Sequence, residues 1–237
     1  MRVLGLLKDT VKKSTFLTRI SLQFINWRNK RIRSNSYRKF GVEALQKFVS
    51  CMDSNSIEYT LAFGSILGAI REHGFIKHDL DIDTFVWIDQ YSQRMVDCII
   101  NAGFKWKTCY LVDEGKLGRE DTFEYHGVTI DVFYLYPAID EYPYCCDFLV
   151  IDGNQKKRLP RRIEIPVSRE RRQVLFENEV HVWIPNNAEQ ICEFRYGPNY
   201  MTPDPQWHWQ SEKNSIHEWP EMAQCTRYLP YPQNIGN

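Results

Sequence analysis

Three aspartates alternate with apolar residues in the stretch "DLDIDTFVW", which is otherwise rich in large apolar side chains. Successive side chains of a strand point to opposite faces, so we expect Asp79, Asp81 and Asp83 to share one face while Leu80 and Ile82 enter a core. Like charges this close repel one another unless a cation compensates them. Carboxylate oxygens suit a hard divalent ion, and the stretch therefore predicts a site for such an ion.

The spacing excludes one known type of ion-binding loop. An EF-hand calcium loop that began at Asp79 would need Gly at its sixth position and Glu at its twelfth, where this sequence has Thr84 and Gln90. Alternation alone does not fix which carboxylates touch the ion. We predict Asp81 and Asp83 as metal ligands, and Asp79 as either a further ligand or a residue that supports them.

A second motif, Gly64-Ser65, follows the apolar run "YTLAF" and opens a short predicted helix. Backbone N–H groups at a helix start can hold a phosphate, Gly64 allows the backbone to come close, and the Ser65 hydroxyl can donate a hydrogen bond. Arg71 could clamp a phosphate with its fork of donors, and Lys77 lies near the following turn. These four residues are the predicted phosphate-binding set; for Arg71 and Lys77 the alternative is a solvated surface charge.

The third acidic position is Asp131 in "VTIDVFYLY". In a strand there, Val128, Ile130 and Val132 share one face and Asp131 points to the other. Acids on one strand face form a line, so an ion held against a phosphate needs an acid from a neighbouring strand. We predict that this strand pairs beside residues 81–86. The alternative is that all three acids are structural residues at strand ends.

The surrounding pattern is mixed α and β. Helices are predicted at residues 41–56, 65–74 and 89–103, the last with Asp89 as N-cap and Gly103 just past its end. The predicted strands are residues 58–63, 81–88, 105–112, 121–127 and 128–136, with a turn at 113–118. Residues 137–170 and 195–237 are rich in Pro, aromatic and charged residues and are predicted as long ordered loops. No internal repeat divides residues 41–237, which are predicted to form one catalytic domain.

The first forty residues differ from the rest in charge. They contain eleven Lys or Arg and one acid, although the whole chain has 30 bases and 30 acids. Apolar residues recur there at helical spacing, which predicts a basic amphipathic extension over residues 1–40. It could bind an anionic membrane surface or pack its apolar stripe on the domain. No recognisable nucleic-acid-binding motif accompanies these bases, so no nucleic-acid partner is predicted.

Seven cysteines are scattered along the chain without a CxxC pair, which indicates reduced thiols. No stretch has the roughly 18 apolar residues needed to span a bilayer, and the first residues are too quickly charged for a signal peptide. We therefore predict a cytoplasmic protein that can lie peripherally at the membrane.

Three stretches together resemble one family. "FGSILGAIREHGFIKHDLDIDTF" resembles the signature of the LicD/fukutin family of the nucleotidyltransferase superfamily, in which a Gly-Thr/Ser-Leu-Leu-Gly-Ala-x-Arg block precedes Gly-Phe-Ile and an acidic strand. "VTIDVFYLY" resembles its third acidic strand, and "PNNAEQICEFRYGPNYMTP" its C-terminal segment. The matches span residues 63–203. Family members often have Pro-Trp before an unbroken acidic run, whereas this chain has Lys77-His78 and then Leu80.

The resemblance implies an α+β fold with a nucleotidyltransferase-like mixed sheet flanked by helices. It also implies transfer of a phosphorylated alcohol, phosphocholine or a polyol phosphate, from a donor such as CDP-choline or CDP-ribitol to a glycan or glycolipid. The resemblance implies that this transfer depends on Mg²⁺ (or Mn²⁺). Asp81 and Asp83 would hold metal against the donor's phosphates, and Asp131 would complete the site or take the acceptor hydroxyl's proton. The alternatives are a nucleotidyltransferase that releases pyrophosphate, and a non-catalytic scaffold of the same fold.

Overall fold

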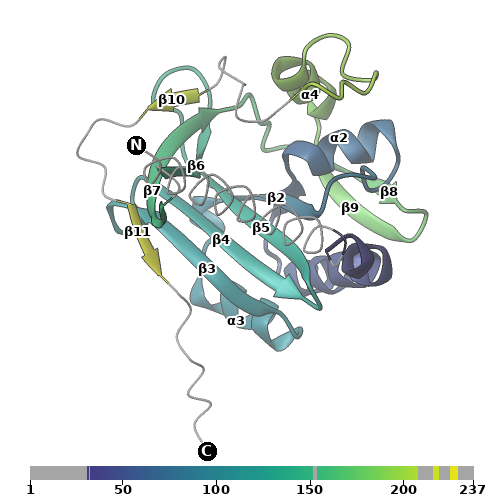
Figure 1. The fold of residues 1–237 in the computed structure, drawn as a ribbon, viewed down its shortest axis with the longest axis horizontal. Coiled ribbons are helices and arrows are strands. Elements are labelled where there is room, and N and C mark those ends of the chain that lie inside the picture. Colours follow the sequence, from purple (N-terminus) through teal and green to yellow (C-terminus); the bar gives the residue numbers. More distant parts are fainter. Residues whose placement is uncertain (1–30, 32, 152–153, 208–215, 219–224, 229–237) are drawn as a thin grey trace, which may run out of the picture.

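The computed structural model describes residues 31, 33–151, 154–207, 216–218 and 225–228 (Figure 1). The basic residues 1–30 lie outside these ranges, so the amphipathic extension stays a prediction. One continuous helix, residues 33–54, runs through position 40, where the extension and the domain were predicted to meet. None of the helices in the described ranges is long and apolar enough to cross a bilayer.

A six-stranded sheet forms the centre of the fold, in the order β1-β2-β5-β4-β3-β11. Its strands are β1 (Tyr59–Leu61), β2 (Asp81–Trp87), β3 (Lys105–Val112), β4 (Gly118–Tyr125), β5 (Val128–Leu135) and β11 (Cys225–Tyr228). β2 and β5 run parallel, and every other neighbouring pair is antiparallel. A short 3-10 turn, η2 (Asp113–Gly115), lies between β3 and β4. This mixed sheet with flanking helices confirms the predicted α+β class.

The two faces of this sheet carry different residues. Along β2, Ile82 and Val86 are buried on one face, whereas Asp83 points to the other. The helix of residues 33–54 covers the apolar face, because its Phe48 ring lies 5.5 Å from the ring of Tyr59, the partner of Val86 in β1. The acidic face therefore lies opposite the main helical layer.

The helix α3 (Gln93–Asn101) begins later than predicted. Its N-cap is Ser92, whose side chain accepts a hydrogen bond from the Met95 backbone N–H at 3.3 Å. Asp89 is instead in a 3-10 turn, η1 (Ile88–Gln90), and pairs with Arg169, so the prediction of Asp89 as N-cap is wrong. Gly103 follows the helix with a φ of 101°, a left-handed conformation that favours glycine.

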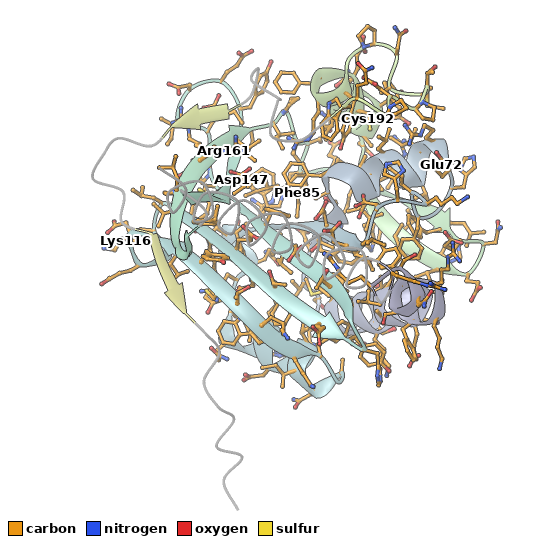
Figure 2. The ribbon with its side chains drawn as sticks, in the orientation of Figure 1. Glu72, Phe85, Lys116, Asp147, Arg161 and Cys192 are labelled. Carbon is orange, nitrogen blue, oxygen red and sulfur yellow. A yellow bond between two sulfur atoms is a disulfide. The ribbon has the colours of Figure 1, made fainter. Side chains whose placement is uncertain are left out.

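Two smaller sheets lie beside the six-stranded one. In the first, β7 (Asn154–Glu164) pairs with both β6 (Tyr144–Ile151) and β10 (Ile216–Glu218). β6 and β7 replace much of the loop predicted at residues 137–170, and β10 lies within the loop predicted at residues 195–237. In the second sheet, β8 (Arg171–Phe176) pairs with β9 (Val180–Pro185). The charges that favoured a loop are paired across the strands instead. Arg161 of β7 binds both carboxylate oxygens of Asp147 on β6, at 2.9 and 2.5 Å (Figure 2). Opposite charges in register stabilise a strand pair, so this part of the loop prediction is wrong.

The two remaining helices are α2 (Phe63–Arg71), directly after β1, and α4 (Ala188–Tyr196), directly after β9. They lie against each other at one end of the molecule (Figure 1).

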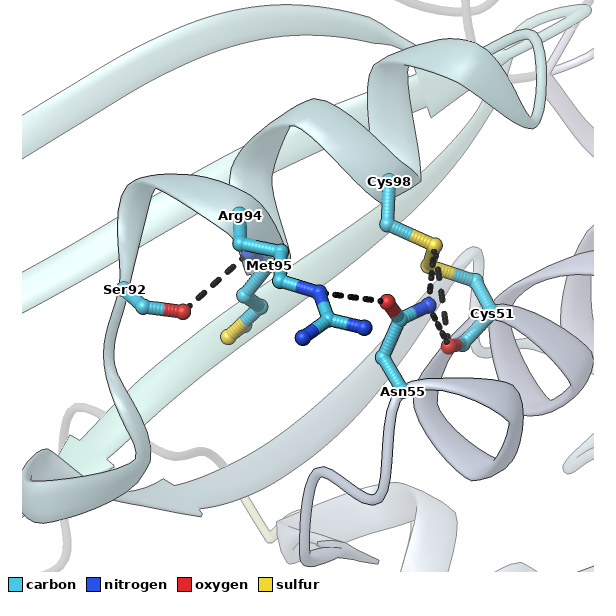
Figure 3. Close-up of a disulfide and its surroundings, with 6 residues drawn as sticks. All are labelled: Cys51, Asn55, Ser92, Arg94, Met95 and Cys98. Atoms are coloured by element: carbon cyan, nitrogen blue, oxygen red, sulfur yellow. Dashed lines mark hydrogen bonds between the residues drawn. A yellow bond between two sulfur atoms is a disulfide. The ribbon is translucent and has the colours of Figure 1, made fainter.

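A disulfide joins the helix of residues 33–54 to α3 (Figure 3). It links Cys51 to Cys98, whose Cα atoms are 6.0 Å apart. The Asn55 amide donates to the Cys51 carbonyl at 2.9 Å, and Arg94 donates to Asn55 Oδ1 at 3.1 Å. The prediction of reduced thiols is therefore wrong for this pair. Four free thiols are buried: Cys109, Cys145, Cys146 and Cys192.

Candidate active site

The register of β2 and β5 brings the predicted acids together. Asp83 is paired with Asp131, and Asp81 with Thr129. Residues directly opposite each other on neighbouring strands point to the same face, so the carboxylates of Asp81, Asp83 and Asp131 share one side of the sheet. The predicted pairing of these two strands is confirmed.

Asp79 stands in the turn before β2 and approaches the start of α2. A Cβ atom built on Gly64 would lie 2.3 Å from Asp79 Oδ2, so only glycine leaves room for this carboxylate. Burial, followed by a hydrogen bond with Asp81 and the charge of Asp81, raises the pKa of Asp79 to about 8. In the absence of a cation, the protonated form of Asp79 is therefore favoured near neutral pH.

The surroundings of Asp83 and Asp131 also disfavour the charged forms of their carboxyls. Burial and the charges of Asp81, Asp79 and Asp131 raise the pKa of Asp83 well above its ordinary value. Burial raises the pKa of Asp131 to about 7, although the Thr122 hydroxyl donates a hydrogen bond to its Oδ1 at 2.6 Å and so favours the charged form. In the absence of a cation, burial therefore favours the neutral forms of these carboxyls.

Two cations lie at the edges of this cluster. Arg33, near the start of the helix of residues 33–54, places Nη2 3.7 Å from Asp81 Oδ2 and donates to the Leu80 carbonyl at 3.1 Å. Arg195, in the last turn of α4, favours the charged form of Asp83. Neither arginine was among the predicted site residues. Arg33 was assigned to the basic extension. Arg195 lies in a segment that was used only for its resemblance to the family.

Backbone hydrogen bonds fix the acidic strand from both sides. Ser65 Oγ accepts from the Asp83 N–H at 2.9 Å, and the Ala62 N–H donates to the Asp83 carbonyl at 2.9 Å. From the other side, the Tyr37 hydroxyl donates to the Asp81 carbonyl at 2.7 Å. Ser65 therefore positions the start of α2 against Asp83, and its contact with a phosphate stays a prediction.

Phe63, the first residue of α2, adopts a φ of 40°, in the left-handed region that bulky residues rarely occupy. Its ring packs edge-on against Phe85 and Phe133, at centroid distances of 5.0 and 4.9 Å. These two rings follow Asp83 and Asp131 by two residues and so share their sheet face. Backbone strain of this kind clusters at functional sites, where the surrounding packing enforces it.

The structure does not bring Arg71 to the start of α2. Seven residues separate it from Gly64, which is about 10 Å along a helix. Its Nε donates to Glu72 at 2.9 Å and its Nη1 donates to the Tyr200 carbonyl at 3.2 Å, so Arg71 ties the segment after α4 to α2. Lys77 is exposed, two residues before Asp79.

The chemistry of the four carboxylates fits a hard divalent cation, because they are oxygen ligands whose mutual repulsion such an ion would relieve. Their present orientations do not close around one point. Among the residues that the structure describes, no three His, Cys, Asp or Glu side chains form a ready arrangement for a metal ion. Asp81 faces Arg33 and Asp131 is bound by Thr122, so ligation would require these side chains to rotate.

Replacing Gly64 with Ala is expected to reduce any activity of this site about 10- to 100-fold, because the new methyl group must displace Asp79 or the start of α2. Steady-state kinetics would measure the effect. Gly41→Ala is the matched control, because its Cβ meets no carboxylate: the nearest atoms belong to the Phe75 ring, at 3.3 Å, and to the Tyr37 ring, at an ordinary contact distance of 3.9 Å. Equal activity of the Gly64→Ala variant and the wild type would remove Asp79 from the site.

The sequence of this chain is similar to known proteins of one family. Residues 56–187, which include β2 and β5, match the family model described as LicD/FKTN/FKRP, nucleotidyltransferase domain. The chain is 22% identical over 199 residues to the ribitol-5-phosphate transferase FKTN of Mus musculus, which covers 79% of this chain and 41% of that protein. The corresponding values for FKTN of Homo sapiens are 21% over 206 residues, 81% and 42%.

A bacterial relative matches a shorter stretch. The chain is 43% identical over 53 residues to the lipopolysaccharide cholinephosphotransferase LicD of Haemophilus influenzae, a match that covers 22% of this chain and 20% of that protein. The chain spans about two fifths of the length of the FKTN relatives. Since the family model matches more than half of its residues, the chain belongs to the LicD/FKTN/FKRP family.

Proposed function

We propose that this chain is a metal-dependent phosphotransferase, which moves a phosphorylated alcohol from a nucleotide-linked donor to a hydroxyl group of a glycan or glycolipid. The observation that carries the proposal is the parallel pairing of Asp83 with Asp131, beside the glycine that opens α2. Phosphoryl transfer depends mainly on the positioning of reactants and on charge stabilisation, and a carboxylate cluster beside a helix start can serve both.

The proposed step breaks one P–O bond and forms another. The acceptor hydroxyl oxygen attacks the phosphorus of the phosphoalcohol, and the bond from that phosphorus to the nucleotide's phosphate oxygen breaks, so that a nucleoside monophosphate leaves. Asp81 and Asp83 would hold Mg²⁺ or Mn²⁺, which supplies positive charge against the donor's phosphates. Asp131 would either complete that site or accept the hydroxyl proton, and the burial that raises its pKa to about 7 in the metal-free protein suits it to the second role.

The names of the relatives suggest the donors to test. FKTN is a ribitol-5-phosphate transferase and LicD of Haemophilus influenzae is a lipopolysaccharide cholinephosphotransferase. CDP-ribitol and CDP-choline are therefore the first candidate donors, and glycans that include lipopolysaccharide are the first candidate acceptors.

Product analysis tests this proposal directly. The protein is incubated with Mg²⁺, a glycan acceptor and CDP-choline, CDP-ribitol or CTP, and the released nucleotide and pyrophosphate are measured. We expect CMP from a CDP-linked donor, because the bond that breaks leaves the α-phosphate on the nucleoside. The Asp83→Asn variant serves as the control for contaminating activities.

Two other outcomes would contradict the proposal. Release of pyrophosphate from CTP, without CMP from the CDP-linked donors, would assign the alternative nucleotidyltransferase activity. Absence of any product that depends on Asp83 would favour the non-catalytic scaffold.

A further inference from the structure

The C-terminal end of α4 brings a guanidinium to the start of α2. Arg195 lies over the ring of Phe63, with Cζ 4.3 Å from the ring centroid, and 6.0 Å from the ring centroid of Trp207. Trp207 in turn packs against Tyr196 at 4.8 Å. Two aromatic faces therefore restrict where the guanidinium can lie.

The ring that Arg195 covers also packs against the strands that carry the acid cluster. The Phe63 ring that it covers also contacts Phe85 and Phe133, which lie on the same sheet face as Asp83 and Asp131. The arginine thus lies over a ring that packs on the residues two positions after Asp83 and Asp131 in their strands.

We propose that Arg195 binds the diphosphate of a nucleoside-diphosphate-linked donor, and that Phe63 and Trp207 fix its guanidinium for this contact. The inference rests on the proposed function and assigns a phosphate-binding residue within it. The diphosphate of such a donor carries two negative charges, and the carboxylates that would hold the ion add more, so a further cation beside them would lower the repulsion. A guanidinium can bind two phosphate oxygens with parallel hydrogen bonds, which a single ammonium group cannot do in the same geometry.

Arg195 could instead have a purely structural role. It stands in the last turn of α4, directly before the C-terminal Tyr196, where any cation stabilises the helix through its dipole. Lysine would fill that role as well as arginine does, but it would lack the planar fork. The two roles therefore predict different results for Arg195→Lys.

The test measures CDP binding in the presence of Mg²⁺ by isothermal titration calorimetry, together with thermal unfolding. We expect Arg195→Ala to weaken CDP binding about 10- to 100-fold, the scale of a lost charge-assisted bidentate contact. Arg195→Lys should recover only a small part of that loss. Phe63→Leu, which keeps an apolar side chain but removes the ring, should weaken CDP binding by a smaller factor.

The matched control is Arg172→Ala. Arg172 is another arginine that contacts α4, through a hydrogen bond to Glu189 near its beginning, but it lies on β8. We expect this variant to bind CDP within twofold of the wild type. Should Arg195→Ala fail to fold, the Lys and Leu variants still decide the question.

The inference is overturned if folded Arg195→Ala binds CDP as tightly as the wild type does. It is equally overturned if Arg195→Lys matches the wild type in CDP affinity and stability, or if the wild type binds neither CDP nor inorganic pyrophosphate. Failure of the proposed function would appear in a different measurement, because the wild type would then release no CMP from a CDP-linked donor. A wild type that releases no CMP but binds pyrophosphate through Arg195 would refute the reaction and keep the binding residue.

Discussion

Replacing Asp83 with Asn is expected to abolish turnover and to raise the thermal stability of the metal-free protein. Turnover should fall about 10³-fold or more, because one negative ligand leaves the ion that is proposed to offset the donor's charge. The Asn side chain has nearly the same shape, and Ser65 binds the backbone N–H of residue 83, so the local structure should persist.

The stability gain follows from the direction of the pKa shift. Burial and three neighbouring acids raise the pKa of Asp83 in the folded state, so between the ordinary pKa and the raised one the folded protein binds more protons than the unfolded chain does. The free energy of unfolding therefore falls as the pH rises through that window. Asn has no charge to bury and should remove this loss. A gain of about 1–2 kcal/mol corresponds to a rise in Tm of roughly 2–8 °C.

The measurement is thermal unfolding of the wild type and the variant in EDTA between pH 4 and 8, with Mg²⁺ added in a second series. Added Mg²⁺ should stabilise the wild type and leave Asp83→Asn nearly unchanged, since an ion that binds only the folded state raises its stability. Asp97→Asn, an exposed acid on α3, is the control. Wild-type turnover in the Asp83→Asn variant would remove Asp83 from the proposed ligands.

Asp131→Asn is expected to have the second largest effect, a loss of turnover of the same order. Asp131 comes from a different strand, and only such an acid can approach the ion from outside the line of Asp81 and Asp83. Asn can still accept the hydrogen bond from Thr122, so the change removes charge and basicity more than structure.

A double variant tests whether Asp83 and Asp131 act on the same ion. If Asp83 and Asp131 serve one ion, the Asp83→Asn/Asp131→Asn protein should be scarcely less active than either single variant, because residues that act as a unit are not additive. Thr122→Val should reduce turnover only about tenfold, since it removes one hydrogen bond that orients Asp131 and keeps the carboxylate. Multiplicative losses in the double variant would mean that the two acids act in separate steps.

The part of the site that was predicted from the sequence is the part encoded locally. Alternation along one strand was enough to place Asp81 and Asp83 on one face, and a second strand with one inward acid was enough to predict its neighbour. Gly64, in the first turn of α2, was predicted to allow a close approach, and the group that approaches it in the structure is Asp79.

The missed residues depend on tertiary packing. Arg195 reaches the start of α2 only because α4 packs against α2, more than a hundred residues after the acidic strand. Arg33 was interpreted from composition as one more base in a basic segment, whereas its backbone lies in the helix that contacts β2. Cys51 and Cys98 are 47 residues apart, on two helices whose contact no local spacing reveals.

The position of the acidic strand β2 also depends on the orientation of the helix of residues 33–54. It is anchored at Cys51 by the disulfide and touches the backbone of Asp81 through Tyr37, fourteen residues earlier, which is a lever arm of about 21 Å. A tilt of about 5° around the anchor would displace Tyr37 by nearly 2 Å perpendicular to that arm, enough to break its 2.7 Å hydrogen bond. A displacement of this helix would therefore act first on the backbone of Asp81.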